Sequence, residues 1–168
     1  MSFDPGQAFI NQAIQHLNAD FFPKIRSCLT LLDDAEIWWR PNQHSNSIGT
    51  LILHLSGNVR QWIVSGLGGA TDERRRDGEF KARGGMTRSK LLQQLDTTLQ
   101  EAVTTLPSLE PDSLERTFQI QAYEVTGLQA IFHVVEHFSY HTGQILFITK
   151  QLEDVDLGFY AELDEEDE

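Results

Sequence analysis

Hydrophobic side chains recur every three to four residues in four long stretches of the chain. This spacing gathers them on one face of a helix, and it predicts α-helices over residues 9–32, 47–65, 87–106 and 126–151. Asn46 or Ser47 is a suitable N-cap for the second helix. Thr126 and Gln129 have the spacing of a capping box at the start of the fourth.

The stretches between these helices lack a helical period, and they cover residues 33–41, 68–86 and 107–125. The second of these stretches, residues 68–86, is either a solvated structural loop or a functional segment, which would be a lid or an anion-contacting edge of a site. In the third, residues 118–123 alternate and could pair briefly, although one short strand cannot make a sheet. Within the first predicted helix, Pro23 removes a backbone donor, so we expect a kink or break near residues 20–22.

Long amphipathic helices with no strong strand pattern indicate an all-α protein, and the arrangement that fits best is a four-helix bundle. A length of 168 residues suits a single domain. We assign the bundle to residues 1–160. The remaining residues, 161–168, include six acids and no base, which predicts a disordered acidic tail.

The overall charge narrows the range of partners. The formal net charge is -12, and half of it lies in the acidic tail. An acidic body argues against nucleic acid as a partner.

No stretch of 18 apolar residues predicts a membrane span, and the N-terminus has no signal-peptide pattern. The single cysteine, Cys28, allows no internal disulfide and is expected to be inert core, so we expect a cytoplasmic protein.

Three histidines stand four residues apart in the last predicted helix: His133, His137 and His141. Side chains four apart project to the same side of a helix, and imidazole is the commonest metal ligand near neutral pH. His54 lies on the apolar row of the second helix and could meet the pair His137 and His141. Three imidazoles plus solvent form the pattern of an open, catalytic metal site, whereas structural zinc sites are closed by four ligands.

The same histidines allow two other interpretations. Buried histidines often serve only as hydrogen-bonded core residues, which leaves a metal-free bundle open. His133-Val-Val-Glu136-His137 also matches the pattern of inverted zincins. That reading is disfavoured, because those enzymes need a further carboxylate ligand far downstream, and Glu136 projects about 100° away from His137.

Two segments resemble motifs of the DinB/YfiT-like superfamily of bacterial metalloproteins. They are residues 47–58 (SIGTLILHLSGN) and residues 133–144 (HVVEHFSYHTGQ). Supporting segments are WWRP at 38–41, EFKARGG at 79–85 and DLGFY at 156–160. Many relatives have His-Arg-Gly-Gln where this chain has Thr142 after His141. The resemblance covers roughly residues 5–160.

The resemblance implies a four-helix bundle in which His54, His137 and His141 bind a divalent ion, zinc or nickel. It also implies a homodimer, a small-molecule substrate and a low-molecular-weight thiol as cosubstrate, since relatives with known chemistry include thiol-dependent S-transferases and isomerases, and others are hydrolases. Asn58, His133 and Gln144 are candidates for orienting a ligand, a substrate or bound water.

The sequence therefore favours a metal-dependent enzyme in which the ion lowers the pKa of a bound thiol or water, giving S-transferase-like or hydrolase-like chemistry. The alternative is a non-enzymatic metal-binding bundle that acts in stress response or protein interaction. The two differ in one prediction. A structural site should be closed, and metal removal should then lower the melting temperature strongly.

Overall fold

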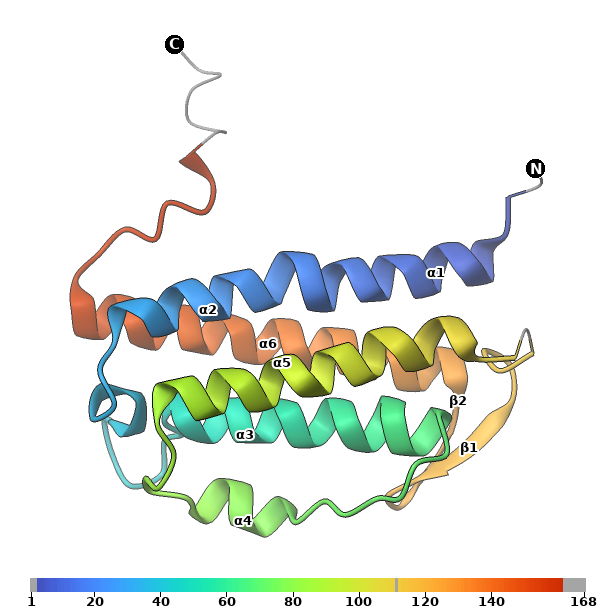
Figure 1. Ribbon diagram of the computed structural model, residues 1–168, viewed down its shortest axis with the longest axis horizontal. Coiled ribbons are helices and arrows are strands. Elements are labelled where there is room, and N and C mark those ends of the chain that lie inside the picture. The colour runs from blue at the N-terminus through green and yellow to red at the C-terminus, as the bar shows by residue number, and fades with distance from the viewer. Residues whose placement is uncertain (1–2, 111, 162–168) are drawn as a thin grey trace.

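Long helical segments lie side by side along the molecule (Figure 1). The computed structural model describes residues 3–110 and 112–161. The first segment runs from α1 through the π-helical η1 into α2, and the second from α3 into the π-helical η3. Their bounds, with those of the other two long helices, are Pro5–Ile14 (α1), Gln15–Phe21 (η1), Phe22–Leu31 (α2), Ile48–Val59 (α3), Arg60–Leu67 (η3), Arg88–Thr105 (α5) and Gly127–Glu153 (α6).

The predicted mostly helical fold is confirmed, but the elements differ from four simple helices. The π-helical turns of η1 divide the first predicted helix at residues 15–21, and Pro23 then lies in the first turn of α2. That position suits proline, because the first N–H groups of a helix have no partner within it. The irregularity expected near residues 20–22 is therefore a change of helix type within a continuous run.

Short elements occupy the stretches that lack a helical period. The 3-10 helices η2 and η4 span Glu36–Trp38 and Leu106–Ser108, and a helix, α4, spans Arg76–Lys81. Strands β1 (Thr117–Ile120) and β2 (Tyr123–Thr126) form an antiparallel hairpin. The expectation that this stretch could not make a sheet was wrong. Its turn falls at Gln121, which has a φ of 56°. The second strand therefore begins at Tyr123, the last of the alternating residues.

Helix starts follow the capping residues in the sequence. Ser47 accepts a hydrogen bond from the Thr50 backbone N–H at the start of α3. Thr126 and Gln129 form a complete capping box at the start of α6. These caps satisfy backbone donors that a helix leaves unpaired in its first turn. They also fix where α3 and α6 begin, and with that the position of each histidine along its helix.

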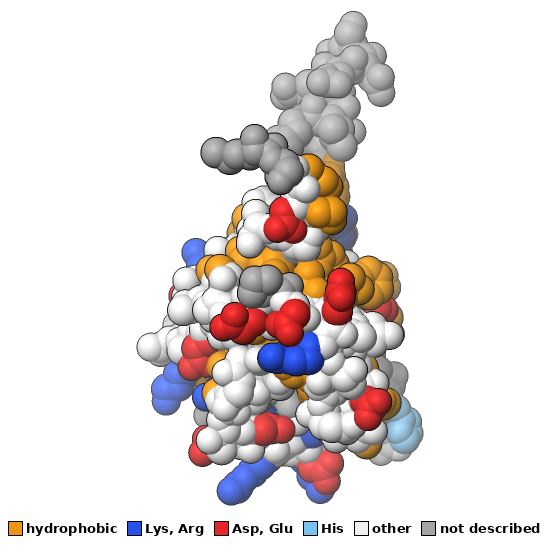
Figure 2. Space-filling model, turned by 90° about the vertical axis from the view of Figure 1, so that its right-hand side faces the viewer, with side chains coloured by type: hydrophobic (Ala, Val, Ile, Leu, Met, Phe, Trp, Pro, Cys, Tyr) orange, Lys and Arg blue, Asp and Glu red, His pale blue; other side chains and the backbone are white. Residues whose placement is uncertain are grey.

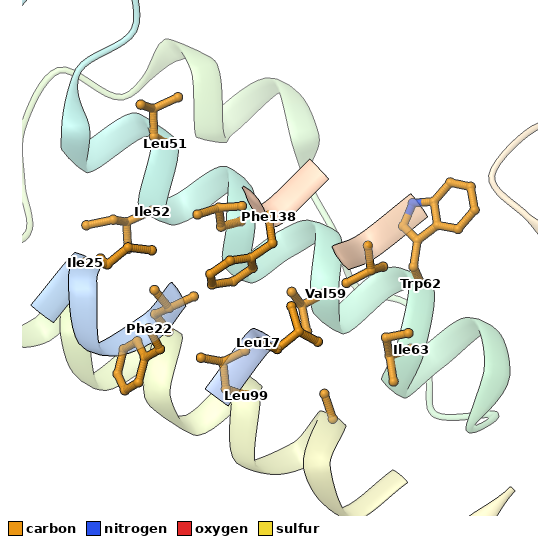
Figure 3. Packing of buried hydrophobic residues seen from close by; sticks show 14 of the residues in the cluster. Leu17, Phe22, Ile25, Leu51, Ile52, Val59, Trp62, Ile63, Leu99 and Phe138 are labelled. Atoms are coloured by element: carbon orange, nitrogen blue, oxygen red, sulfur yellow. The ribbon is translucent and has the colours of Figure 1, made fainter. Parts of the chain in front are cut away.

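One continuous hydrophobic core joins the long helices (Figure 3). Phe138 of α6 is fully buried, and Figure 3 shows it among residues of η1, α2, α3 and α5. Cys28 is buried in the same core, as the sequence predicts, and burial raises the pKa of its thiol. Phe138 lies between His137 and His141 in the sequence, so its anchoring sets the rotation of the helix that presents them.

The surface at the hairpin end carries acidic and basic side chains interspersed among polar ones (Figure 2). On this face the basic groups do not gather into one patch. Across residues 3–110 and 112–161, no helix combines the length and the hydropathy needed to cross a bilayer. Of the predicted acidic tail, residues 162–168 lie outside the described part of the chain.

We predict that Phe138→Ala lowers the free energy of unfolding by about 3–5 kcal/mol, because it leaves a cavity in the shared core. Phe132→Ala is the matched control on the same helix, since Phe132 is 60% exposed. It should change stability by about 0.5 kcal/mol or less. Chemical denaturation monitored by circular dichroism measures both. Equal losses for the two variants would contradict the assignment of Phe138 as the anchor of α6.

Candidate metal centre

Three histidines from two antiparallel helices converge at one point. α3 and α6 run in opposite directions (Figure 1) and pack against each other. His54 comes from α3, and His137 and His141 lie one turn apart on α6. The His137 Nε2 atom is 3.0 Å from His54 Nε2 and 3.1 Å from His141 Nε2. One ring nitrogen from each residue lies within 4.8 Å of the other two.

Hydrogen bonds on the far side of two rings decide which nitrogen carries the proton. The Glu79 carboxylate has no proton to donate, so His54 Nδ1–H donates to Glu79 Oε2 at 2.9 Å. Arg74 Nη2 lies 3.1 Å from the same His54 nitrogen and donates to Glu79 Oε2 at the shorter distance of 2.9 Å. His141 Nδ1–H likewise donates to the carbonyl oxygen of the Gln144 side chain at 2.7 Å. A neutral imidazole carries one N–H, so Nε2 of both His54 and His141 presents a lone pair to the centre.

His137 faces both of these lone pairs with its own Nε2. A proton on its Nε2 could satisfy only one of the two facing nitrogens, His54 or His141. Its own Nδ1 is buried and has no hydrogen-bond partner among the described residues. Burial first, and then the neighbouring histidines, lower the pKa of His137 to about 3. The ring is therefore neutral at physiological pH, as a metal ligand must be.

Two of the three nitrogen separations are close to those around a divalent ion, and the third lies within 4.8 Å. Zn–N bonds of about 2.0–2.1 Å in a tetrahedral site put two ligand nitrogens about 3.4 Å apart. The observed separations of 3.0 and 3.1 Å are close to this value. His54 and His141 are both more than nine-tenths buried. At least one of their Nε2 lone pairs is therefore buried without a donor, which is costly, and a cation at the centre would be bound by all three rings.

A buried ion pair holds the outer side of His54. Arg74 donates from Nε to Glu79 Oε1 at 2.7 Å and from Nη2 to Oε2 at 2.9 Å. Burial raises the pKa of Glu79, but the hydrogen bonds from Arg74 and His54 outweigh burial and leave it lowered. The carboxylate thus stays ionised and holds the His54 proton on Nδ1. Carboxylates commonly orient histidine ligands in this way.

Glycine at position 57 makes this contact possible. Gly57 lies one turn after His54 on α3, and a Cβ there would overlap the Glu79 carboxylate and crowd Arg74. α4, which carries Glu79, therefore packs directly on the α3 backbone. Phe80 of α4 adds a ring contact with His54, with centroids 4.6 Å apart. The second irregular stretch of the sequence is thus a cover over one side of the histidine cluster.

The other predicted residues take different places. Gln144 contacts His141, as described above. His133 lies outside the cluster: its ring centre is 4.2 Å from that of Trp62 in a tilted contact, and its Nε2 is 3.3 Å from the Asn58 amide nitrogen. Tyr140 is exposed. Thr142 is buried and donates to the Phe138 carbonyl, so it faces the core and not the cluster.

Sequence reasoning missed Glu79 as a partner of His54 and placed Arg74 only as a possible anion contact. No spacing rule connects residues 54 and 79. The only signal was the segment EFKARGG at residues 79–85, which resembles the family but carried no assigned role. The geometry agrees with the rejection of the inverted-zincin pattern, because Glu136 is exposed and His133 is not among the clustered histidines.

Comparison with known proteins relates this chain to one protein family and to a solved structure. A family described as "Protein of unknown function (DUF1572)" matches residues 4–160. The chain belongs to the DUF1572 family. Among solved structures, it is similar to a DinB-like protein, YjoA, from Bacillus subtilis. The TM-score is 0.67 with 19% sequence identity, over 89% of this chain and 98% of that one. No functionally curated protein matches the chain.

The DinB-like fold expected from the sequence motifs is thereby confirmed for this DUF1572 member. At 19% identity the likeness establishes the fold alone. The three-histidine cluster is compatible with a divalent metal site. What this DUF1572 protein does must therefore be argued from its own residues.

We predict that Gly57→Ala displaces α4, because the new Cβ would occupy the position of the Glu79 carboxylate. If the arrangement with α4 packed on α3 is destabilised by about 1.4 kcal/mol, the population in which α4 is detached rises about tenfold. Trypsin should then cleave at residues 74–83 correspondingly faster. Gly78→Ala is the control, since a Cβ there meets nothing within 4 Å. Equal cleavage of both variants would contradict the close packing of α4 on α3.

The lowered pKa of His137 makes the stability of the metal-free protein depend on pH. A histidine with a depressed folded-state pKa destabilises the fold as pH falls through the window between its unfolded and folded values, here from 6.5 to about 3. Between pH 7 and pH 5 this should cost on the order of 1–2 kcal/mol. Urea unfolding in the presence of a chelator measures it. His137→Asn should flatten the dependence, and an unchanged slope would refute the assignment.

Proposed function

We propose that this protein is a metal-dependent enzyme of the DinB-like type. His54, His137 and His141 would hold one divalent ion, zinc or nickel, through their Nε2 atoms. The observation that supports this most is the hydrogen bonding of Glu79 and Gln144, which fixes two Nδ1 protons and turns the Nε2 lone pairs toward one point. Imidazole nitrogens suit zinc and nickel better than magnesium or calcium.

The number of ligands supports an enzyme over a structural site. The cluster contains three residues, and no fourth histidine, cysteine or carboxylate joins it within residues 3–110 and 112–161. The nearest described carboxylate, Glu79, is already held by His54 and Arg74. Structural zinc sites are normally closed by four protein ligands, whereas catalytic sites have three and leave one position open.

When bound, a divalent ion at this centre lowers the pKa of a thiol or water molecule and so supplies a nucleophile near neutral pH. The protein's own groups would perform the remaining tasks. Glu79 and Gln144 keep the Nδ1 protons of His54 and His141 in place and hold the rings in position. The side chains of α4, above all Phe80, exclude water from the outer side of His54.

The reaction we propose is the attack of such a nucleophile on a small electrophile, in the manner of a thiol-dependent S-transferase or a hydrolase. A homodimer, which the family resemblance implies, and a cytoplasmic location, which the sequence pattern predicts, are part of the same proposal. The competing function, a metal-binding bundle without activity, would require the ion chiefly for stability.

We predict about one zinc or nickel ion per chain in protein purified without an affinity tag. His54→Ala, His137→Ala and His141→Ala should each lose it, because two imidazoles hold an ion far less tightly than three. His133→Ala is the matched control, since His133 lies on the same helix but outside the cluster. Mass spectrometry of metal content measures all five proteins, and circular dichroism checks that each variant is folded.

Metal retained in the three cluster variants, or absent from the parent after reconstitution, would overturn the metal site. A strong fall in melting temperature on chelation would instead favour the non-enzymatic alternative, because structural ions contribute folding energy directly.

A further inference from the structure

A cleft of about 450 Å³ opens beside the histidine cluster. His54 and His137 form part of its wall, so a molecule in this cleft would lie next to their nitrogens. Trp62, Tyr123, His133 and Arg76 line it from η3, the hairpin, α6 and α4. The cleft is therefore built where α3, η3, α4, the hairpin and α6 meet beside the histidine cluster.

The charge of this cleft is opposite to that of the protein. The chain has a net charge of -12, yet the lining residues include two arginines and no aspartate or glutamate. Arg74 is engaged with Glu79. Arg76 is exposed and forms no ion pair with a described residue. An unpaired guanidinium in a cleft without acids is a site for an anion.

Ring contacts keep Arg76 close to the cluster. Its guanidinium lies 4.8 Å from the centre of the Phe80 ring, and the Phe80 ring centre lies 4.6 Å from that of His54. The neighbouring Arg75 lies elsewhere: it lines a second cleft, together with Asp72, Glu73 and Glu79. Two adjacent arginines thus face different surroundings, one with acids and one without.

Aromatic rings supply a second wall of the cleft. The Trp62 and Tyr123 rings are 6.2 Å apart, centre to centre, and the His133 ring lies 4.2 Å from Trp62 at a tilt of 42°. Trp62 is 5% exposed, whereas Tyr123 is 57% exposed. The Tyr123 ring therefore offers most of the apolar contact surface to a planar group, and Trp62 packs beside it.

We propose that this cleft binds a small organic anion, with its charged group at Arg76 and its planar apolar part against Tyr123, next to Trp62. This binding mode would direct the remaining end of the molecule toward His54 and His137. The assignment of this anion as the substrate rests on the proposed function, whereas its binding at Arg76 does not require the metal.

The test uses benzoate as the probe and benzamide as its neutral counterpart of the same shape. Titration of the full-length protein is followed by the Trp62 indole N–H signal in NMR spectra, with added zinc and with chelator. Benzoate should shift this signal, and benzamide should bind much more weakly. Arg76→Gln should weaken benzoate binding about tenfold, because it removes a charge-assisted hydrogen bond. Arg75→Gln, the matched control, should leave it unchanged.

Equal binding of benzoate and benzamide, equal losses in the two arginine variants, or no binding of benzoate would each overturn the proposal. Binding that vanishes with chelator and is unaffected by Arg76→Gln would also overturn it, because the carboxylate would then sit on the ion. Arg76-dependent binding in a protein that takes up no zinc would support the anion site while refuting the proposed metal centre. The two claims can therefore fail separately.

Discussion

The arrangement of the site depends on two hydrogen bonds that lie outside the histidine cluster. Glu79 and Gln144 accept the Nδ1 protons of His54 and His141, and a neutral imidazole has only one proton to give. The Nε2 atoms of both rings must then turn lone pairs toward His137, whose own pKa is depressed to about 3. Without an ion, His137 can donate one proton to only one of these two nitrogens, and the other lone pair is left buried without a donor. A cation at the centre would satisfy all three rings. The chemistry proposed for this protein follows from that constraint.

The rest of the fold keeps these groups in register. Phe138 fixes the rotation of α6 from within the core, and Gly57 lets α4 approach α3 closely enough for Glu79 to reach His54. Hydrogen bonds connect this region to the hairpin. Arg74 Nη1 donates to the Gln61 side-chain oxygen, and the hairpin residue Gln121 donates to that same oxygen. The hairpin, α4 and the histidine cluster are thus parts of one connected structure, with the anion cleft lying between them.

Much of this arrangement could be predicted from sequence. Local signals located the long helices: the apolar period, Ser47, and the capping box at Thr126. The steps of four along α6 likewise singled out His137 and His141. The contact between Glu79 and His54 could not be predicted, because it joins residues in separate elements and lies in a stretch without a period. The hairpin was missed because its turn, at Gln121, falls inside the alternating segment. Tertiary packing decides both features, and spacing along the chain does not encode it.

The most direct test of the central claim is anomalous X-ray diffraction from crystals of the zinc-loaded protein. The account predicts one zinc peak, bound by Nε2 of His54, His137 and His141 at about 2.0–2.1 Å, with Nδ1 of His54 still on Glu79. A zinc peak elsewhere, or none at the cluster in crystals that contain zinc, would show that the three histidines only hydrogen-bond to one another.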